Sequence, residues 1–356
     1  MHINALVSAL RNRVPWSVAR RLLTVSGASA SQGWERTETR LTADNVDRDT
    51  KDALIEALRE HILGGEKLVR FYRLPRAEMN SIRAAVAALT VEPSALSRAY
   101  PGILSAAALV GGGLGHRLAA VERREDGTAV IYHSIRIVEV RELIAPERLP
   151  QAAREALEGF DEVVGFKEMK LQAYDVIWVP NEGNFVEVRV DFPKGSRRDI
   201  SESAHAQVTR AFGASIEHRF YYDAINLFPL INAMYVSEDE GDVVELAFST
   251  TTGSLKHEKM RRSRQSLRRE LYHTSGKAGL QTPIEPYLLS LRWQRRPGRD
   301  NAAQPELELH STSYEVASET ARLYEMTVRN CLYLDDYLFV RNRAKHHLRA
   351  IARAVA

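Results

Sequence analysis

The chain lacks most of the residue patterns that would point directly to a reaction. Its 356 residues include one cysteine, Cys331, which excludes an internal disulfide and a cysteine cluster for zinc or iron. No His-Glu-x-x-His, Cys-x-x-Cys or Gly-x-Ser-x-Gly sequence occurs, so the common zinc hydrolases, dithiol oxidoreductases and serine esterases have no support. We therefore predict no cofactor, and we expect Cys331 to be a buried helix residue.

Long apolar runs are missing as well. The nearest candidate, residues 103–118, is short and is interrupted by four glycines between 111 and 115. That glycine run lacks the strand before it and the Gly-Lys-Ser/Thr ending of a phosphate loop, so we expect a connector there. At the amino end, MHINALVSALRNR places its arginines after the apolar residues, unlike a secretory signal. The sequence thus predicts a cytoplasmic protein with no membrane partner.

Charge, by contrast, is abundant and is dominated by arginine. Forty Arg and nine Lys stand against 46 acidic residues, which gives a net charge of +3. An excess this small does not indicate an anionic partner by itself, so the case must rest on local clusters. Arginine is the better bidentate phosphate donor, but an Arg-rich and Ala-rich chain is also typical of a GC-rich bacterial genome.

Apolar periodicity predicts an α+β fold of antiparallel sheets with flanking helices and no doubly wound parallel sheet. The length favours two domains, residues 1–150 and 151–356, the second with an antiparallel sheet and two terminal helices. A change of parity along the strand at 128–143 predicts a bulge near Ile137. The predicted strands lie near 67–74, 118–124, 128–143, 160–171, 174–179, 185–192, 244–248, 289–293 and 307–309, and the helices near 49–63, 76–89, 200–213, 318–334 and 336–355.

The hairpin at 174–192 carries the pattern closest to a catalytic site. Asp175 on one strand, with Glu187 and Arg189 on the next, imitates the hairpin of a restriction-type nuclease, in which Asp and Glu hold Mg²⁺ near a basic residue. Lysine is expected where Arg189 stands, and a guanidinium that stays protonated is a poor substitute. Glu187, Arg189 and Asp191 also alternate with valines, as on a half-exposed strand with a solvated polar face. The second interpretation is the favoured one.

Two basic segments form the main candidate site. Lys256–His273 holds seven Lys or Arg against two Glu, and if it is helical, Arg261, Arg264 and Arg268 form a ridge that could follow a phosphate backbone. The loop beyond it contributes the second group. The predicted nucleic-acid-binding residues of that loop are Trp293, Arg295, Arg296 and Arg299, an aromatic beside cations as in single-strand binders.

The terminal helix is basic as well. From Arg341 onwards it contains five Lys or Arg and no acidic residue, so its outer face is expected to be positive.

The leading hypothesis is a non-enzymatic, nucleic-acid-contacting component of a bacterial multiprotein system, in genome processing or antiviral defence. Two alternatives stay open. One is a Mg²⁺-dependent nuclease that uses Asp175, Glu187 and Arg189. The other is a scaffold subunit whose basic faces dock an acidic protein partner. The sequence does not distinguish DNA from RNA and does not indicate whether the chain forms a homo-oligomer.

Overall fold

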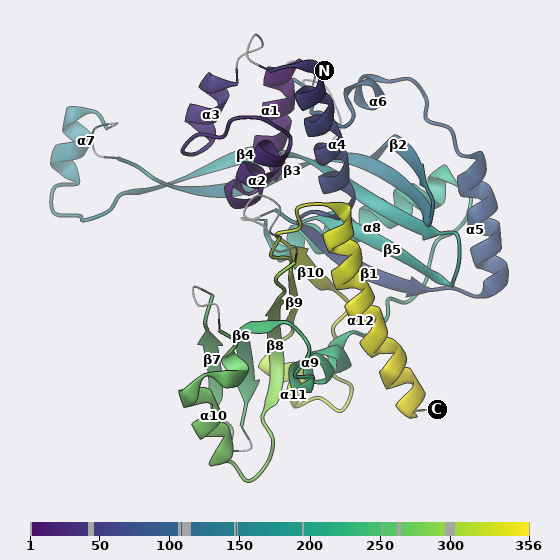
Figure 1. Cartoon of the computed structure of the whole chain (residues 1–356), viewed down its shortest axis with the longest axis vertical. Coiled ribbons are helices and arrows are strands. Elements are labelled where there is room, and N and C mark those ends of the chain that lie inside the picture. The colour runs from purple at the N-terminus through teal and green to yellow at the C-terminus, as the bar shows by residue number, and fades with distance from the viewer. Residues whose placement is uncertain are drawn as a thin grey trace.

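The computed structural model describes residues 2–41, 46–105, 108, 115–145, 147, 149–193, 196–250, 252–261, 265–295 and 303–355. The side chains of 138, 140–142, 167, 169, 354 and 355 are outside the description. The α+β prediction is confirmed, because one antiparallel sheet carries helices on its faces (Figure 1). Of the glycine run, 111–114 lie outside the described residues.

Ten strands form the sheet, in the order β2-β3-β4-β5-β1-β10-β9-β8-β6-β7. Neighbouring strands pair antiparallel throughout. Strand β1 therefore lies beside β5 and β10, which are far from it in sequence. The strands are β1 Lys67–Arg73, β2 Arg117–Arg124, β3 Gly127–Leu143, β4 Val164–Pro180, β5 Phe185–Asp191, β6 Asp242–Ser249, β7 Leu255–Lys259, β8 Glu285–Arg292, β9 Glu306–His310 and β10 Met326–Arg329.

Helices cover both faces of the central strands. One apolar cluster joins one face to α1, α2, α4, α9 and α12, and a second joins the other face to α5 and α8. None of the helices in the described ranges combines the length and apolar character that a membrane span needs. The helices are α1 Ile3–Arg13, α2 Trp16–Val25, α3 Trp34–Arg40, α4 Arg48–Gly64, α5 Arg76–Ala88, α6 Ala95–Ala99, α7 Gln151–Ala156, α8 Arg198–Ser215, α9 Phe228–Val236, α10 Leu271–Ala278, α11 Ser313–Val316 and α12 Leu334–Val355.

Strand β5 is buried on both faces. Val186, Val188 and Val190 belong to the cluster with α5 and α8, as alternation along a strand requires. Glu187 and Arg189, on the opposite face, are also fully buried, and Asp191 is nearly so. The predicted solvated polar face is therefore wrong. The charged face is covered by helices and is neutralised by internal ion pairs.

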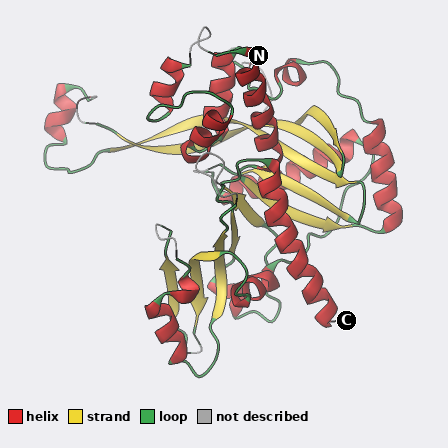
Figure 2. Cartoon of the chain, viewed as in Figure 1, coloured by secondary structure: helices red, strands yellow, loops and turns green. Residues whose placement is uncertain are grey.

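Strands β3 and β4 form a long hairpin that extends beyond the sheet as an arm (Figures 1 and 2). They pair without interruption from Gly127 opposite Pro180 to Leu143 opposite Val164. The predicted bulge near Ile137 is therefore wrong, and so is the division of β4 into two strands. A register shift lies instead in β2, between Leu118 and Ala120. The division of the chain at residue 150 falls in the connection of this hairpin.

The predicted helix at 318–334 is wrong, and Lys256–His273 is not the helix that the ridge of arginines requires. Within Lys256–His273 the chain forms β7, which pairs with β6, then a 3₁₀ turn at Leu267–Arg269 and the start of α10. Within 318–334 it forms β10, a central strand, and Cys331 is buried in the connection that follows. In both segments pairing with a neighbouring strand outweighs the local helical pattern.

Candidate functional site

The structure does not assemble the predicted nuclease triad. Trp178 lies opposite Glu187, and Val176 lies opposite Arg189. Side chains alternate between the two faces of a strand, so Asp175 points to the face opposite Glu187 and Arg189. Of the three residues, only Glu187 and Arg189 touch each other, through a 2.8 Å ion pair. The described residues contain no group of three or more His, Cys, Asp or Glu that could hold a metal ion.

Asp175 is occupied by structural partners. It accepts hydrogen bonds from the Arg136 guanidinium and from His116 Nε2, the latter at 2.6 Å. Its Oδ1 also accepts the backbone N–H of Asp191 at 2.9 Å. Burial alone would raise the pKa of Asp175, but Arg136 and His116 together hold it well below its ordinary value. The carboxylate is therefore ionised and fully paired.

Glu187 joins the sheet to α12. Its carboxylate accepts from Lys345 Nζ at 2.8 Å, from the Tyr337 hydroxyl at 3.0 Å and from Arg341 Nη1 at 3.4 Å. Burial would raise the pKa of Glu187, but Lys345, Arg189 and Arg341 outweigh it and hold the pKa well below its ordinary value. Four groups from β5 and α12 thus share one buried negative charge.

The guanidinium of Arg189 contacts two aromatic rings and a backbone carbonyl. The guanidinium lies 4.3 Å from the Tyr337 ring centroid and 4.9 Å from that of Trp178, and Nη1 donates to the Leu63 carbonyl at 2.9 Å. A guanidinium that makes these contacts has no freedom to activate water. The arrangement supports a structural role for Arg189.

A second buried charge cluster lies at the start of β1. Asp191 Oδ1 accepts from Lys67 Nζ at 2.5 Å, and Oδ2 accepts from Arg13 Nη2 at 2.6 Å. Burial lowers the pKa of Lys67 to about 8, although Asp191 opposes the shift. Burial also raises the pKa of the adjacent Glu66 to about 7, although the carboxyl accepts the backbone N–H of Asn330. These groups join α1, β1 and β5 in the interior.

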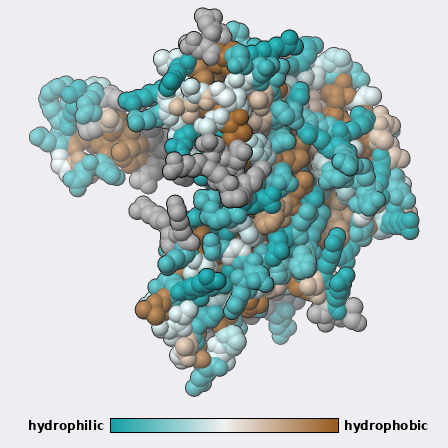
Figure 3. Space-filling model, in the orientation of Figure 1, coloured by the Kyte–Doolittle hydropathy of each residue, from teal (hydrophilic) through white to brown (hydrophobic). Residues whose placement is uncertain are grey.

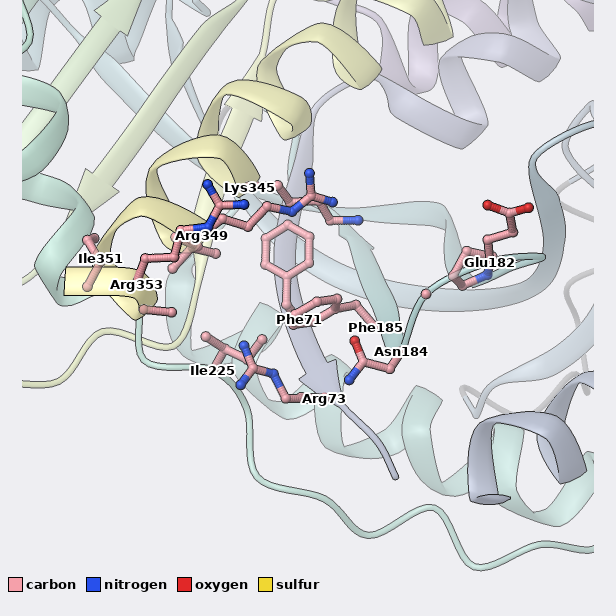
Figure 4. Close-up of a pocket in the computed structure, with 14 residues that line it drawn as sticks. Phe71, Arg73, Glu182, Asn184, Phe185, Ile225, Lys345, Arg349, Ile351 and Arg353 are labelled. Carbon is pink, nitrogen blue, oxygen red and sulfur yellow. The ribbon is translucent and has the colours of Figure 1, made fainter. Parts of the chain in front are cut away.

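A groove lies where α12 crosses the ends of β1 and β5 (Figure 4), and we refer to it as the α12 groove. Its volume is about 570 Å³, which is within the roughly 300–1,000 Å³ of ligand sites. The floor is apolar: Phe71 lies beneath, and the half-buried Phe185, Ile225, Leu348 and Ile351 line it. Such a floor can accept a flat, apolar group from a ligand.

Four cations follow α12 at intervals of four residues: Arg341, Lys345, Arg349 and Arg353. Side chains four apart share one side of a helix, so the set forms a row, and its last three members line the groove. Arg341 and Lys345 are paired with Glu187. Arg349 and Arg353 are exposed, and among the described residues neither has an acidic partner. The outer half of the row therefore keeps its charge free.

Arg73 faces this row across the groove (Figure 4). Its guanidinium lies 5.0 Å from the Phe185 ring centroid, and Lys345 Nζ lies 5.5 Å from the Phe71 centroid. Glu182 is the one acidic residue among those that line the groove within the described ranges. An anion with an apolar part would meet cations on both sides and an aromatic ring between them.

The predicted ridge of Arg261, Arg264 and Arg268 is not observed as a helix face. Arg261 pairs with Glu245 at 2.6 Å and also with Glu306. Arg264 lies outside the described residues. Arg268 donates to the carbonyls of Tyr235, Met234, Glu240 and Gly241 at 2.6–2.8 Å, so it holds the end of α9.

The described residues of the second predicted site, Trp293 and Arg295, also make contacts within the protein. Trp293 is buried, with its ring centroid 5.8 Å from that of Phe339. Arg295 stacks on the same Phe339 at 4.4 Å and pairs with Asp335 at 2.7 Å. Arg296 and Arg299 lie outside the described residues. Nucleic-acid contact by this loop stays a prediction.

Sequence reasoning identified the basic terminal helix but missed the α12 groove. The four-residue spacing from Arg341 to Arg353 is visible in the sequence and could have located the row. The apolar floor has no such signal, because Phe71 and Phe185 meet only through the pairing of β1 with β5.

No protein-family model, curated protein or solved structure matches this chain.

Proposed function

We propose that the protein binds single-stranded nucleic acid in the α12 groove, as a non-enzymatic component of a bacterial multiprotein system. One observation carries the proposal: Arg349 and Arg353 are exposed, lack an acidic partner among the described residues and flank an apolar floor. Proteins commonly hold a single strand with cations beside an aromatic ring, here Phe185 in the floor. The phosphates contact the cations while the bases stack on the ring.

The charge of the α12 groove favours a polyanion over a neutral ligand. Arg349 and Arg353 are about 6 Å apart along the helix axis, so they present a row of donors and not a single point charge. Arg73, which has no acidic partner within the described ranges, adds a third cation on the opposite side. Guanidinium groups bind phosphate oxygens in bidentate fashion, which makes this set suited to a phosphate backbone.

The apolar floor favours a single strand over a duplex. A duplex keeps its bases stacked inside and would leave Phe185, Ile225 and Leu348 without a partner. A single strand can turn a base towards Phe185, where Arg73 already stacks on the ring. Base–aromatic stacking of this kind tolerates any base, so we expect little sequence preference.

The proposal includes the assembly in which the protein acts and its location in the cell. A binding subunit without chemistry of its own works as part of a larger assembly, and genome processing or defence would supply single strands. A cytoplasmic location is in keeping with the single cysteine. An acidic protein is the competing occupant of the α12 groove, and the experiment below distinguishes it.

Fluorescence anisotropy with labelled single-stranded DNA and RNA oligonucleotides, at low and at physiological salt, tests the proposal. We expect binding that weakens with salt and that falls tenfold or more in Arg349→Glu/Arg353→Glu. The matched control is Arg48→Glu/Arg197→Glu, which makes the same charge change at two exposed sites on α4 and next to α8. Absence of binding at low salt, or an equal loss in both variants, would refute the proposal.

A further inference from the structure

The arm formed by β3 and β4 has an unsupported outer half. Strand β2 pairs with β3 only up to His133, and β5 pairs with β4 only from Val176 onwards. Residues 134–136 and 171–173 are still buried against the body, where the Gln172 carbonyl accepts from Asn12 and Arg136 donates to the Asp191 carbonyl. Beyond them, 137–143 and 164–170 pair only with each other, and α7 lies at the tip (Figures 1 and 2). An isolated two-stranded ribbon is marginally stable in water, so a ribbon of this length indicates that another surface supports it.

Large apolar side chains are exposed along the arm. The exposed fractions are 43% for Ile137, 61% for Leu143, 69% for Phe160 and 65% for Phe166. Figure 3 shows apolar colouring on this projecting lobe. A cluster of exposed apolar residues on an otherwise charged surface marks an interaction site.

The tip of the arm is acidic around an aromatic anchor. In residues 151–162, four carboxylates, those of Glu155, Glu158, Asp161 and Glu162, stand against one arginine. All four are exposed, and Phe160 lies between Glu158 and Asp161 in the sequence. An exposed aromatic side chain that is flanked in the sequence by carboxylates suits a partner with an apolar recess next to cations.

The α12 groove has that complementary character. It offers Phe185, Ile225 and Leu348 as a floor, with Arg73, Arg349 and Arg353 around them. The arm of the same chain cannot reach it, because the arm projects on one side of the molecule and the carboxyl half of α12 lies on the other (Figure 1). A second copy of the chain can bring its arm to this groove.

We propose that the tip of the arm docks in the α12 groove of a second copy of this chain. Phe160 enters the apolar floor, and Glu158 and Glu162 pair with Arg349 and Arg353. Reciprocal docking of two arms closes a twofold dimer in which both grooves are filled. This docking rests on the charge and shape of the groove and does not require that the groove bind nucleic acid. If it does bind nucleic acid, the arm competes for the same cations and shields the groove until a strand displaces it.

Sedimentation velocity without nucleic acid, on charge-reversed variants, tests the docking. Glu158→Arg/Glu162→Arg reverses the tip, and Arg349→Glu/Arg353→Glu reverses the groove. We expect the parent chain to sediment as a dimer and each variant alone as a monomer of 40.1 kDa. A mixture of the two variants restores both contacts, since each reversed tip meets an oppositely charged groove, so we expect the mixture to dimerise again.

Phe160→Ser is a second variant that leaves every charge in place. Phe160 is exposed, so its replacement leaves the core intact, and we expect at least a tenfold weaker dimer. A parent chain that stays monomeric at all micromolar concentrations, or a mixture of reversed variants that stays monomeric, would overturn the docking. Circular dichroism melts verify that each variant is folded.

The outcomes separate docking from nucleic-acid binding. A monomeric parent that binds oligonucleotides through Arg349 and Arg353 removes the docking and leaves the proposed function. If the parent binds no oligonucleotide but the mixture of reversed variants dimerises, the proposed function is removed and the docking stands. Where both hold, the tip-reversed variant binds an oligonucleotide more tightly than the parent, because the arm of a second copy no longer occupies its α12 groove.

Discussion

Lys345 on α12 and Glu187 on β5 form a 2.8 Å ion pair that links the α12 groove to the interior of the sheet. Glu187 is fully buried, whereas Lys345 also lines the groove. One carboxylate thereby fixes the position of the helix whose next two turns carry the free cations. The stability of the sheet and the shape of the groove depend on the same residue.

Replacement of Glu187 by alanine is expected to destabilise the fold strongly. It leaves Arg189 buried without its carboxylate and releases Lys345 and Arg341. The loss of one partner from a buried ion pair lowers the free energy of unfolding by about 3–5 kcal/mol. Urea denaturation measures the change. Glu182→Gln at the exposed rim of the groove is the control, expected within about 0.5 kcal/mol of the parent. A Glu187→Ala protein as stable as this control contradicts the assignment.

Stability is expected to fall between about pH 4.5 and 7 because of Glu66. Burial raises the pKa of Glu66 from 4.5 to about 7. A raised folded-state pKa means that the protonated carboxyl is favoured in the folded chain, so its contribution is fully present below pH 4.5 and is lost as the pH rises through 7. Glu66→Gln removes this titration. We expect the variant to match the parent at pH 4.5 and to exceed it by about 1–3 kcal/mol at pH 8. Urea unfolding midpoints of the parent and Glu66→Gln at both pH values measure this effect. The same difference between the two proteins at pH 4.5 and at pH 8 would count against the burial of an ionisable Glu66.

Arg268 is expected to matter for stability and not for nucleic-acid affinity. Its guanidinium donates to the carbonyls at the end of α9, so Arg268→Ala leaves several of them unsatisfied. We expect a loss of about 2–4 kcal/mol in the free energy of unfolding, with oligonucleotide affinity within twofold of the parent. Arg269→Ala, at the exposed next position, is the matched control and is expected to change neither quantity. A tenfold loss of affinity in Arg268→Ala at full stability would restore the original ridge as a binding surface.

Asp175→Asn is expected to make the protein less stable at neutral pH, by a margin that shrinks in acid. The buried Arg136 loses its counter-charge in the variant, which costs about 3–5 kcal/mol at pH 7. Because the folded-state pKa of Asp175 is held below 3.8, its contribution is present above that pH and disappears as the pH falls. The difference between the thermal melts of parent and variant should therefore decrease steadily as the pH falls below about 4. A constant difference across this range would show that the charge of Asp175 is not the stabilising element.

Alternation along β5 shows what the sequence could and could not predict. The pattern of Val186, Val188 and Val190 against Glu187 and Arg189 located the strand and separated its two faces. It could not tell whether the charged face meets water or opposite charges, because both give the same alternation. The partners of Glu187 come from α12, about 150 residues away, and only the packed fold brings them together.

Strand pairing also explains the errors in the basic segments. The spacing of Arg261, Arg264 and Arg268 suits a helix, yet Leu255–Lys259 pairs with β6 and the chain then turns. The positive charge of Arg261 was visible in the sequence, but its acidic partners Glu245 and Glu306 were not, since those lie on β6 and β9. On α12 the local pattern sufficed, because residues that share one side of a helix are close in sequence.

Nucleic-acid binding in the α12 groove is decided by the salt dependence of oligonucleotide affinity. For single strands, the slope of log K against log salt concentration falls by about 0.7 for each phosphate contact that is removed. If Arg349 and Arg353 each contact a phosphate, the slope for Arg349→Glu/Arg353→Glu is shallower than that of the parent by at least about 1.4, while the slope of Arg48→Glu/Arg197→Glu is unchanged. A parent slope that both variants share would show that the groove does not contact the phosphate backbone.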